Sequence, residues 1–224
     1  MRFDIMTLFP EMVTGVLNTS ITGRAIQAGV IEVSAHNIRD HSEDKHRRVD
    51  DTPYGGGFGM VMAAPPICAC FDSIPRSAGR VRTIYMSPKG KVLTQKKAAE
   101  LSRFDQLIIL CGHYEGVDER AIEEICDEEI SIGDYILTGG ELAACVLVDC
   151  VSRLIDGVLA DEKCHTEETV SCGMLEYPQY TRPPVFRGRE VPGVLMSGNH
   201  EEVERWRYGK ALEDTLKKRK DLIY

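Results

Sequence analysis

The feature that most constrains the fold is a regular alternation of helical and strand-like segments between residues 64 and 155. Strands are predicted at 82–86, 106–110 and 128–131, and helices at 64–73, 94–101, 118–125 and 140–155. A strand at 3–8, helices at 11–17 and 20–28, and a strand at 30–38 precede them. Such alternation is typical of a parallel sheet covered on both faces. The sequence therefore predicts an α/β fold.

Three glycine-bearing turns follow predicted strands, at 87–90, 111–116 and 131–141. Each alone is an ordinary strand-to-helix turn, but ligands of open α/β sheets bind at the carboxyl ends of the strands. Three in succession favour one shared pocket. The sequence has no Gly-x-Gly-x-x-Gly fingerprint and no P-loop, and these turns hold no basic cluster for phosphates. A ligand with an adenine, a ribose and a small charged tail would suit the pocket better than a dinucleotide.

Two segments lack periodicity. Residues 39–60 are rich in charge and glycine and are too long for a simple connector, which is typical of a functional loop. Residues 159–172 are acidic and polar, and we interpret them as a flexible linker. The predicted domains are thus 1–158, which would bind the ligand, and 173–224, a small helical domain that ends in a helix at 201–220.

Composition excludes some classes of protein. No apolar run approaches the ~18–20 residues that cross a bilayer, and the N-terminus reads directly into a strand, so we expect a cytoplasmic protein. Most of the eight cysteines lie in apolar runs without metal-ligand spacing, so we expect reduced thiols and no metal site. The net charge of −8 opposes bulk binding to nucleic acid, but it divides as −7, −3 and +2 over the three segments. Local patches of the C-terminal domain could still hold an RNA, although a solvated face is the simpler interpretation.

Several blocks of sequence resemble one known family. Thr7 to Glu11, Lys45-His46 with Val49 to Asp51, and Pro53 to Met60 are similar to the N-terminal signature of the bacterial tRNA (guanine-N1)-methyltransferases, the TrmD family. Residues 112–120, 131–142, 180–183 and 195–200, followed by Trp206-Arg207, match it in order and spacing. The resemblance covers nearly the whole chain.

The resemblance implies a fold and an activity that periodicity alone does not reach. The family belongs to the SPOUT class, in which the C-terminal part of the sheet is threaded into a trefoil knot, and it acts as a homodimer with active sites at the subunit interface. It methylates the N1 atom of guanosine 37 of tRNA, with S-adenosylmethionine as methyl donor, when another guanosine precedes the target. A magnesium requirement is also implied by the family.

Carried over by position, fourteen residues would form the S-adenosylmethionine pocket, and all of them lie on or beside the three turns. They are Tyr85, Met86, Ser87, Pro88, Gly112, Tyr114, Glu115, Gly116, Ile132, Gly133, Tyr135, Leu137, Gly139 and Gly140. The family usually has proline after Glu-Leu where this chain has Ala143, so that edge of the pocket is expected to be less rigid.

The reaction needs a base to remove the N1 proton of guanine and a donor for the charge that develops on its oxygen. Arg153 matches the family's arginine for the oxygen; otherwise it is a surface arginine favoured by a helix C-terminus. The family has Asp-Ser-Phe where this chain has Glu168-Thr169-Val170. We interpret Glu168 as the base and Thr169 as its hydroxyl neighbour. Glu167 is the rival, and a solvated linker acid is the alternative.

The loop at 39–60 would read the RNA, with Lys45 and His46 contacting phosphate or base, and Asp50 and the amide of Gly59 reading the preceding guanosine. Asp50 could instead cap a turn. Trp206 and its basic neighbours would hold the tRNA stem, or the tryptophan would only anchor a charged helix. Two other functions stay open: methylation at another RNA position, and RNA binding without catalysis.

Overall fold

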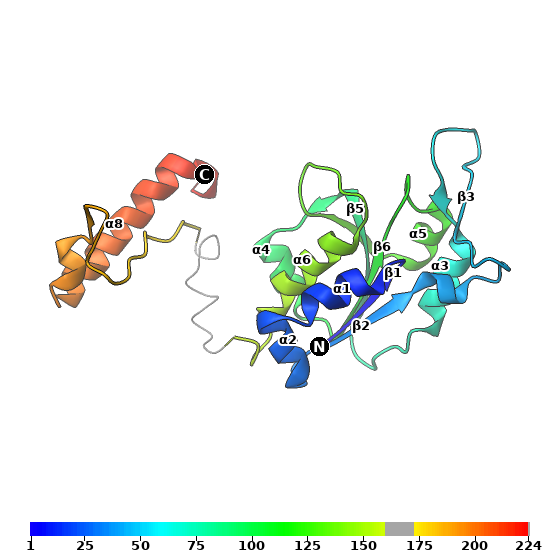
Figure 1. The fold of residues 1–224 in the computed structure, drawn as a ribbon, viewed down its shortest axis with the longest axis horizontal. Coiled ribbons are helices and arrows are strands. Elements are labelled where there is room, and N and C mark those ends of the chain that lie inside the picture. Colours follow the sequence, from blue (N-terminus) through cyan, green and yellow to red (C-terminus); the bar gives the residue numbers. More distant parts are fainter. Residues whose placement is uncertain (160–172, 224) are drawn as a thin grey trace. The chain divides into compact units, whose positions relative to one another are not determined.

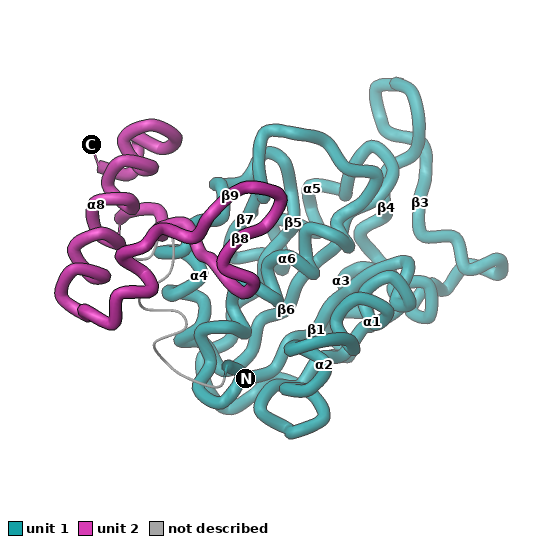
Figure 2. The backbone as a smooth tube through the Cα atoms, turned by 60° about the vertical axis from the view of Figure 1, so that its left-hand side comes forward, with its two compact units in different colours: residues 1–160 teal, residues 161–224 magenta. Residues whose placement is uncertain are grey.

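The computed structural model describes residues 1–159 and 173–223, and its chain divides into two compact units, 1–160 and 161–224 (Figure 2). The boundary between the units falls inside the predicted linker at 159–172. Apart from residue 159, that linker lies outside the described residues.

The first unit is built on a five-stranded sheet in the order β2-β1-β6-β5-β7, with every neighbouring pair parallel (Figure 1). The strands are β1 (Arg2–Thr7), β2 (Glu32–Asn37), β5 (Val81–Val92), β6 (Gln106–Cys111) and β7 (Glu128–Ser131). All six residues of the central strand β6 are buried. A parallel strand covered on both faces reads as a continuous apolar run, as Leu107 to Cys111 do.

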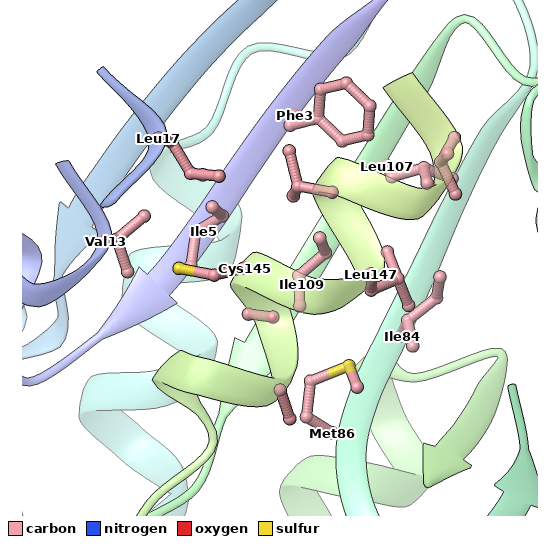
Figure 3. Close-up of a cluster of buried hydrophobic side chains, with 14 of the residues drawn as sticks. Phe3, Ile5, Val13, Leu17, Ile84, Met86, Leu107, Ile109, Cys145 and Leu147 are labelled. Carbon is pink, nitrogen blue, oxygen red and sulfur yellow. The ribbon is translucent and has the colours of Figure 1, made fainter. Parts of the chain in front are cut away.

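Helices cover both faces of this sheet. One buried core joins the sheet to α1 (Pro10–Leu17), α4 (Gln95–Leu101) and α6 (Glu141–Ser152), with Ala25 of α2 (Ser20–Gln27). In Figure 3, Val13 and Leu17 from α1 and Cys145 from α6 lie around Ile5 of β1, while Leu147 of α6 lies toward Ile109 and Ile84. The other core joins the sheet to α3 (Ala64–Ser73) and α5 (Glu119–Ile125). The predicted α/β fold with helices on both faces is confirmed for the first unit.

A buried polar cluster lies at the amino end of the sheet, away from the strand ends that hold the predicted turns. Asp4 of β1 is fully buried and accepts hydrogen bonds from Arg2 (2.7 Å) and Gln106 (2.7 Å), and it contacts His36 Nε2 at 2.7 Å. Burial opposes ionisation of Asp4, but the bonds from His36, Arg2 and Gln106 outweigh it and hold its pKa below the usual value. The cluster ties β1, β2 and β6 together.

Three predictions for the first unit need correction. The segment 87–90 is not a turn but an irregular stretch within β5, where pairing with β7 shifts register between Met86 and Lys91. Gly90 fits there because a Cβ would collide with the backbone of Glu129. The helix predicted at 140–155 ends at Ser152. The loop at 39–60 is not structureless: it holds a 3₁₀ turn, Ile38–His41, and β3 (Asp50–Asp51), which pairs antiparallel with β4 (Val61–Met62).

The second unit contains a hairpin, β8 (Val185–Phe186) and β9 (Arg189–Glu190), a 3₁₀ turn at Gly193–Met196, helix α8 (His200–Lys218) and a 3₁₀ turn at Lys220–Leu222. Thr215 of α8 is buried and accepts a hydrogen bond from the Leu175 amide at 2.9 Å, which ties the start of the unit to its long helix. The hairpin was not predicted. Among the described residues of either unit, no helix is long and apolar enough to cross a membrane.

Candidate cofactor cleft at the carboxyl ends of the strands

A cleft of about 350 Å³ opens in the first unit where β5, β6 and β7 end. Its volume falls within the range of small-molecule sites, and its place follows the rule for ligands of open α/β sheets. Three loops wall it, residues 87–89, 112–117 and 131–139, and Val61, Tyr85, Ile122, Ile130 and Ala143 complete the lining. The structure thus brings the three glycine-bearing segments together around one cleft.

Of the fourteen predicted pocket residues, twelve line this cleft. They are Tyr85, Ser87, Pro88, Gly112, Tyr114, Glu115, Gly116, Ile132, Gly133, Tyr135, Leu137 and Gly139. The other two do not line it. The side chain of Met86 packs in the core beneath the sheet, and Gly140 directly precedes helix α6.

Two glycines let the loops approach each other closely. A Cβ on Gly140 would lie 2.8 Å from the Cα of Cys111, and the Gly140 amide donates a 2.9 Å hydrogen bond to the Gly112 carbonyl. A Cβ on Gly112 would lie 2.8 Å from the hydroxyl oxygen of Tyr85. A side chain at position 140 would force the loops apart, and one at position 112 would displace the Tyr85 ring. The cleft therefore depends on glycine for its shape.

The third wall is ordered by its own short hydrogen bonds. The Gly133 amide donates to Ser131 Oγ at 3.1 Å, and the Tyr135 hydroxyl donates to the Ile132 carbonyl at 3.1 Å. Gly133 has a φ of +146°, which few other residues adopt. The same wall exposes apolar surface, with Ile136 80% exposed. An exposed isoleucine beside a cleft is surface that a ligand or a second protein could cover.

A buried carboxyl group underlies the cleft. Glu141, at the first turn of α6, is 1% exposed, accepts a 2.7 Å hydrogen bond from Thr7 Oγ1 and lies 3.1 Å from His113 Nε2. Thr7 Oγ1 also accepts a hydrogen bond from the Phe9 amide at 2.9 Å. The His113 ring packs against the Phe9 ring with centroids 4.8 Å apart. These contacts join the ends of β1 and β6 to the start of α6 and so hold the floor of the cleft.

Burial also sets the protonation of the cleft wall. It raises the pKa of Tyr85 to about 12, and nearby Glu129 adds to the effect. It likewise raises the pKa of the Cys111 thiol, which lies just beneath the cleft. Tyr85 therefore keeps its proton at neutral pH and stays a hydrogen-bond donor. Neither group is poised as a nucleophile.

The loop predicted to read RNA is joined to the cleft by backbone hydrogen bonds. The Glu115 amide donates to Met60 at 3.0 Å, the Met62 amide to Gly116 at 2.9 Å and the Asp118 amide to Met62 at 2.9 Å. Gly59 lies against Glu115, since a Cβ there would come within 2.5 Å of the Glu115 side chain. Asp50 pairs with Met62 across the β3–β4 ribbon. Gly59 therefore lies against Glu115, which lines the cleft, and Asp50 lies opposite Met62, the neighbour of the lining residue Val61.

Asp44 organises the basic part of the same loop. Its Oδ1 accepts hydrogen bonds from the His46 amide at 2.8 Å and the Arg48 amide at 3.3 Å. Its Oδ2 accepts one from the Arg48 guanidinium at 2.9 Å. The hydrogen bonds from Arg48 and His46 hold the pKa of Asp44 well below its usual range. Lys45 and His46 are exposed on this turn. They are therefore available to an approaching polyanion.

Of the predicted catalytic residues only Arg153 is described, and it does not line the cleft of its own chain. Arg153 is half-buried at the C-cap of α6, and the twelve residues of that helix place it about 18 Å along the axis from its cleft end. Glu168, Thr169 and the rival Glu167 lie outside the described residues. Trp206 belongs to the second unit, where its ring lies 6.3 Å from that of Tyr180. The described residues contain no cluster of His, Cys, Asp or Glu that could hold a metal ion.

Sequence reasoning missed the group beneath the cleft. Thr7, His113 and Glu141 all lie within the quoted motifs, but only the fold brings residues 134 positions apart into a 2.7 Å contact. A polar residue at the end of an apolar strand, as Thr7 is, was the available signal. The six cysteines among the described residues are all free, and burial raises the thiol pKa of four of them well above the usual value.

Comparison with known proteins identifies the family. The family described as tRNA (Guanine-1)-methyltransferase TrmD matches residues 1–224. The chain belongs to this family. A protein named tRNA (guanine-N(1)-)-methyltransferase from Lachnospira eligens is 56% identical over 223 residues, which cover 99% of this chain and 94% of the relative. Proteins of the same name are 56% identical in Ruminiclostridium cellulolyticum and 57% identical in Caldanaerobacter subterraneus, covering 100% of this chain and 96% and 92% of the relatives.

Membership of the TrmD family gives the cleft and the β3–β4 ribbon a common context. The motifs that carry the resemblance, around residues 53–60, 112–116 and 131–141, meet in one region of the first unit. Identity of this extent covers both units, so the second unit belongs to the family as well.

Proposed function

We propose that this chain methylates the N1 atom of guanosine 37 of tRNA, just 3′ of the anticodon, with S-adenosylmethionine as methyl donor, when another guanosine precedes the target. Membership of the TrmD family and the names of its relatives support guanine-N1 methylation of tRNA. The observation that carries the cofactor is the cleft, in which three glycine-bearing loops meet at the carboxyl ends of parallel strands.

The lining of the cleft suits a nucleoside that lacks phosphate. Lys89 and His113 are the only basic side chains among the lining residues, while Ile132 and Leu137 offer apolar surface for an adenine. Glu115 is the acidic side chain of the lining that could receive an ammonium group. When bound, S-adenosylmethionine supplies an electrophilic methyl group. The described residues offer magnesium no cluster of ligands, and no step is assigned to it.

Arg153 and Glu168 are proposed to act on the target base. Glu168 would take the N1 proton of guanine with Thr169 beside it, and the Arg153 guanidinium would donate to the guanine oxygen as negative charge develops there. Tyr85, which keeps its proton, lines the cleft as a donor. Asp50 and the Gly59 amide, joined to the cleft through Met60 and Met62, are proposed to read the preceding guanosine.

The position of Arg153 supports a homodimer with shared active sites. It lies about 18 Å of helix away from the cleft of its own chain, so a cleft is best completed by the Arg153 of a second copy. Antiparallel pairing of two α6 helices about a twofold axis would bring the end of each helix to the start of the other. The outer face of α6 exposes Leu142 and Val146, and the adjacent α1 exposes Met12 and Val16. This is an apolar surface suited to such pairing.

A trefoil knot of the SPOUT type is also proposed. The segment 132–140 lies against the loop that follows β6, since the Gly140 amide donates to the Gly112 carbonyl. Threading of that segment through the neighbouring loop would close the knot and fix the walls of the cleft. A cytoplasmic location is proposed because that is where a bacterial cell holds its tRNA.

Methyl transfer to tRNA transcripts tests the activity. Transcripts with and without the guanosine that precedes the target are compared for wild type, Arg153→Ala and Glu168→Gln, with Glu167→Gln as the matched control. We expect transfer to the first transcript only, loss of about 10²-fold or more in Arg153→Ala and Glu168→Gln, and activity retained in Glu167→Gln. Wild-type protein that binds S-adenosylmethionine but methylates neither transcript would overturn the proposal. Full activity of Glu168→Gln would overturn the assignment of the base.

Mixing inactive subunits tests the shared site. A cleft variant, Gly140→Val, and Arg153→Ala are each expected to be inactive alone. If Arg153 serves the cleft of the other subunit, their heterodimer keeps one complete site, and random mixing restores about a quarter of wild-type activity. Should the mixture stay as inactive as its components while heterodimers form, the shared site is refuted.

A further inference from the structure

The net positive charge of residues 173–224 lies on one exposed arm. All ten residues at 181–190 are exposed, and this segment, which contains the β8–β9 hairpin, holds three arginines and a single acid, Glu190. The remaining residues of 173–224 contain seven basic and seven acidic side chains. The surplus of +2 in this part of the chain therefore resides entirely in the arm.

Most basic side chains of α8 form ion pairs, whereas those of the arm do not. Five of the seven basic residues that follow the arm form ion pairs along α8 and its end: Arg205–Glu201, Arg207–Glu204, Lys210–Glu213, Lys218–Asp214 and Arg219–Asp221, at 2.6–2.8 Å. In contrast, no carboxylate among the described residues pairs with Arg182, Arg187 or Arg189. Lys217 of α8 has no ion pair among the described residues, but neither has Glu202, so α8 has no net charge and the surplus lies on the arm.

The hairpin presents an aromatic ring together with two of these cations. Phe186 pairs with Arg189 across the hairpin, which puts their side chains on one face, and the Arg187 guanidinium lies 5.4 Å from the centre of the Phe186 ring. Phe186 is 61% exposed. Arg187 and Gly188 form the turn with φ of +49° and +76°. A two-residue turn of this kind favours Asn-Gly, so arginine stands at the tip against its backbone preference.

The base of the arm is tied to α8 by aromatic contacts. The Tyr180 and Trp206 rings lie 6.3 Å apart, and the Arg207 guanidinium stacks 4.8 Å from the centre of the Tyr177 ring. Trp206 is only half-exposed. These contacts explain Trp206 as a residue that positions the arm and leave the arm itself to meet a partner.

We propose that the arm at 181–190 is the surface through which the second unit binds tRNA. Arg187 and Arg189 would contact backbone phosphates, and Phe186 would stack on an unpaired base. Unpaired arginines beside an exposed ring are the combination that binds single-stranded or looped RNA. This inference rests on the proposed function, because it takes tRNA as the substrate. The RNA-binding surface of this unit would then be the β8–β9 hairpin, and not the predicted basic patch around Trp206 on α8.

Direct binding of a tRNA transcript to the full-length protein tests the arm. Affinity is measured between about 50 and 200 mM salt for wild type, for Arg187→Gln with Arg189→Gln, and for a matched control, Arg205→Gln with Lys210→Gln, which removes two paired cations from α8. The arm variant is expected to lower the slope of log affinity against log salt by roughly 1.5–2, and the control by less than about 0.5.

Stacking is tested separately from charge. Phe186→Ala is expected to weaken tRNA binding about tenfold without changing the salt slope, and Phe186→Tyr is expected to restore it. The affinity for S-adenosylmethionine is expected to stay at the wild-type value in every arm variant, because the cleft belongs to the first unit.

Three results would contradict the proposed role of the arm in binding tRNA. If the arm variant has the same salt slope as the control, the arm is not the RNA surface, and methylation by wild type would still uphold the proposed function. If the arm variant instead lowers the unfolding temperature or alters the oligomeric state with unchanged tRNA affinity, the arm docks on the protein and the inference is wrong. Wild-type protein that neither binds nor methylates tRNA would overturn both.

Discussion

Replacing Thr7 by valine removes a buried hydroxyl while nearly preserving the shape of the side chain. That hydroxyl donates to Glu141 Oε1 at 2.7 Å and accepts the Phe9 amide at 2.9 Å, and Thr7 and Glu141 are 0% and 1% exposed. A buried acceptor left without its donor costs about 1–3 kcal/mol, and a second lost hydrogen bond about 0.5–1.5 kcal/mol. The expected loss of about 2–4 kcal/mol lowers the melting temperature by roughly 4–16 °C in a domain of this size.

Calorimetry of Thr7→Val checks this value, with Thr14→Val as the matched control. The Thr14 hydroxyl donates only to the Pro10 carbonyl at 3.1 Å on the exposed side of α1, so its loss is expected to shift melting by less than about 2 °C. Thr7→Ser keeps the hydroxyl and is expected to recover most of the stability. Thr7→Val that melts within about 2 °C of wild type would refute the role of Thr7 in holding Glu141.

Three further predictions concern the cleft, the apolar surface and pH. Gly140→Ala is expected to abolish binding of S-adenosylmethionine in calorimetric titration, because its Cβ would lie 2.8 Å from the Cα of Cys111, whereas Gly15→Ala, with nothing within 4 Å, binds normally. Val146→Glu is expected to convert dimers to monomers in light scattering while the fold is retained in circular dichroism, because it puts charge on an exposed apolar face. Asp4 has a pKa below its usual 3.8, so its stabilising effect is complete above that pH and is lost as pH falls through the folded-state value. Asp4→Asn is therefore expected to lower the unfolding temperature at pH 7 and to flatten its decline below about pH 4, and an unchanged pH profile would contradict the assignment.

The fold class could be predicted because strand-like segments, such as the apolar run of β6, alternate along the chain with helical ones. Phe3 and Ile5 alternate with Asp4 and Met6 between the two faces of β1, and this pattern is visible in the sequence. The stretch at 87–90 could not be assigned correctly, since proline and glycine also mark turns. A side chain at position 90 would collide with the backbone of β7, and this need for glycine cannot be seen in the sequence because β5 and β7 are not consecutive strands.

The candidate site was predictable in part for a similar reason. Loops that end neighbouring parallel strands must meet, so Gly112 and Gly133 could be placed in one pocket from their positions alone. The contact between Thr7 and Glu141 could not, because it joins strand β1 to the helix that follows the last strand of the sheet. The hairpin at 185–190 could not be predicted because its strands are two residues long and fully exposed, so the sequence shows no alternation of apolar and polar residues there.

The loop predicted to read RNA and the loop predicted to hold the cofactor behave as one body. Residues 59–62 and 113–118 share three backbone hydrogen bonds of 2.9–3.0 Å, and the side chain of Glu115 fills the space that a side chain on Gly59 would need. A displacement of either loop must therefore strain the other, since each of these bonds is short and directional. A base seated against Asp50 and a cofactor seated against Glu115 would thus each favour the same arrangement of the ribbon. Glycine at position 59 is thus favoured twice, by its φ of +80° and by the Glu115 side chain that lies against it.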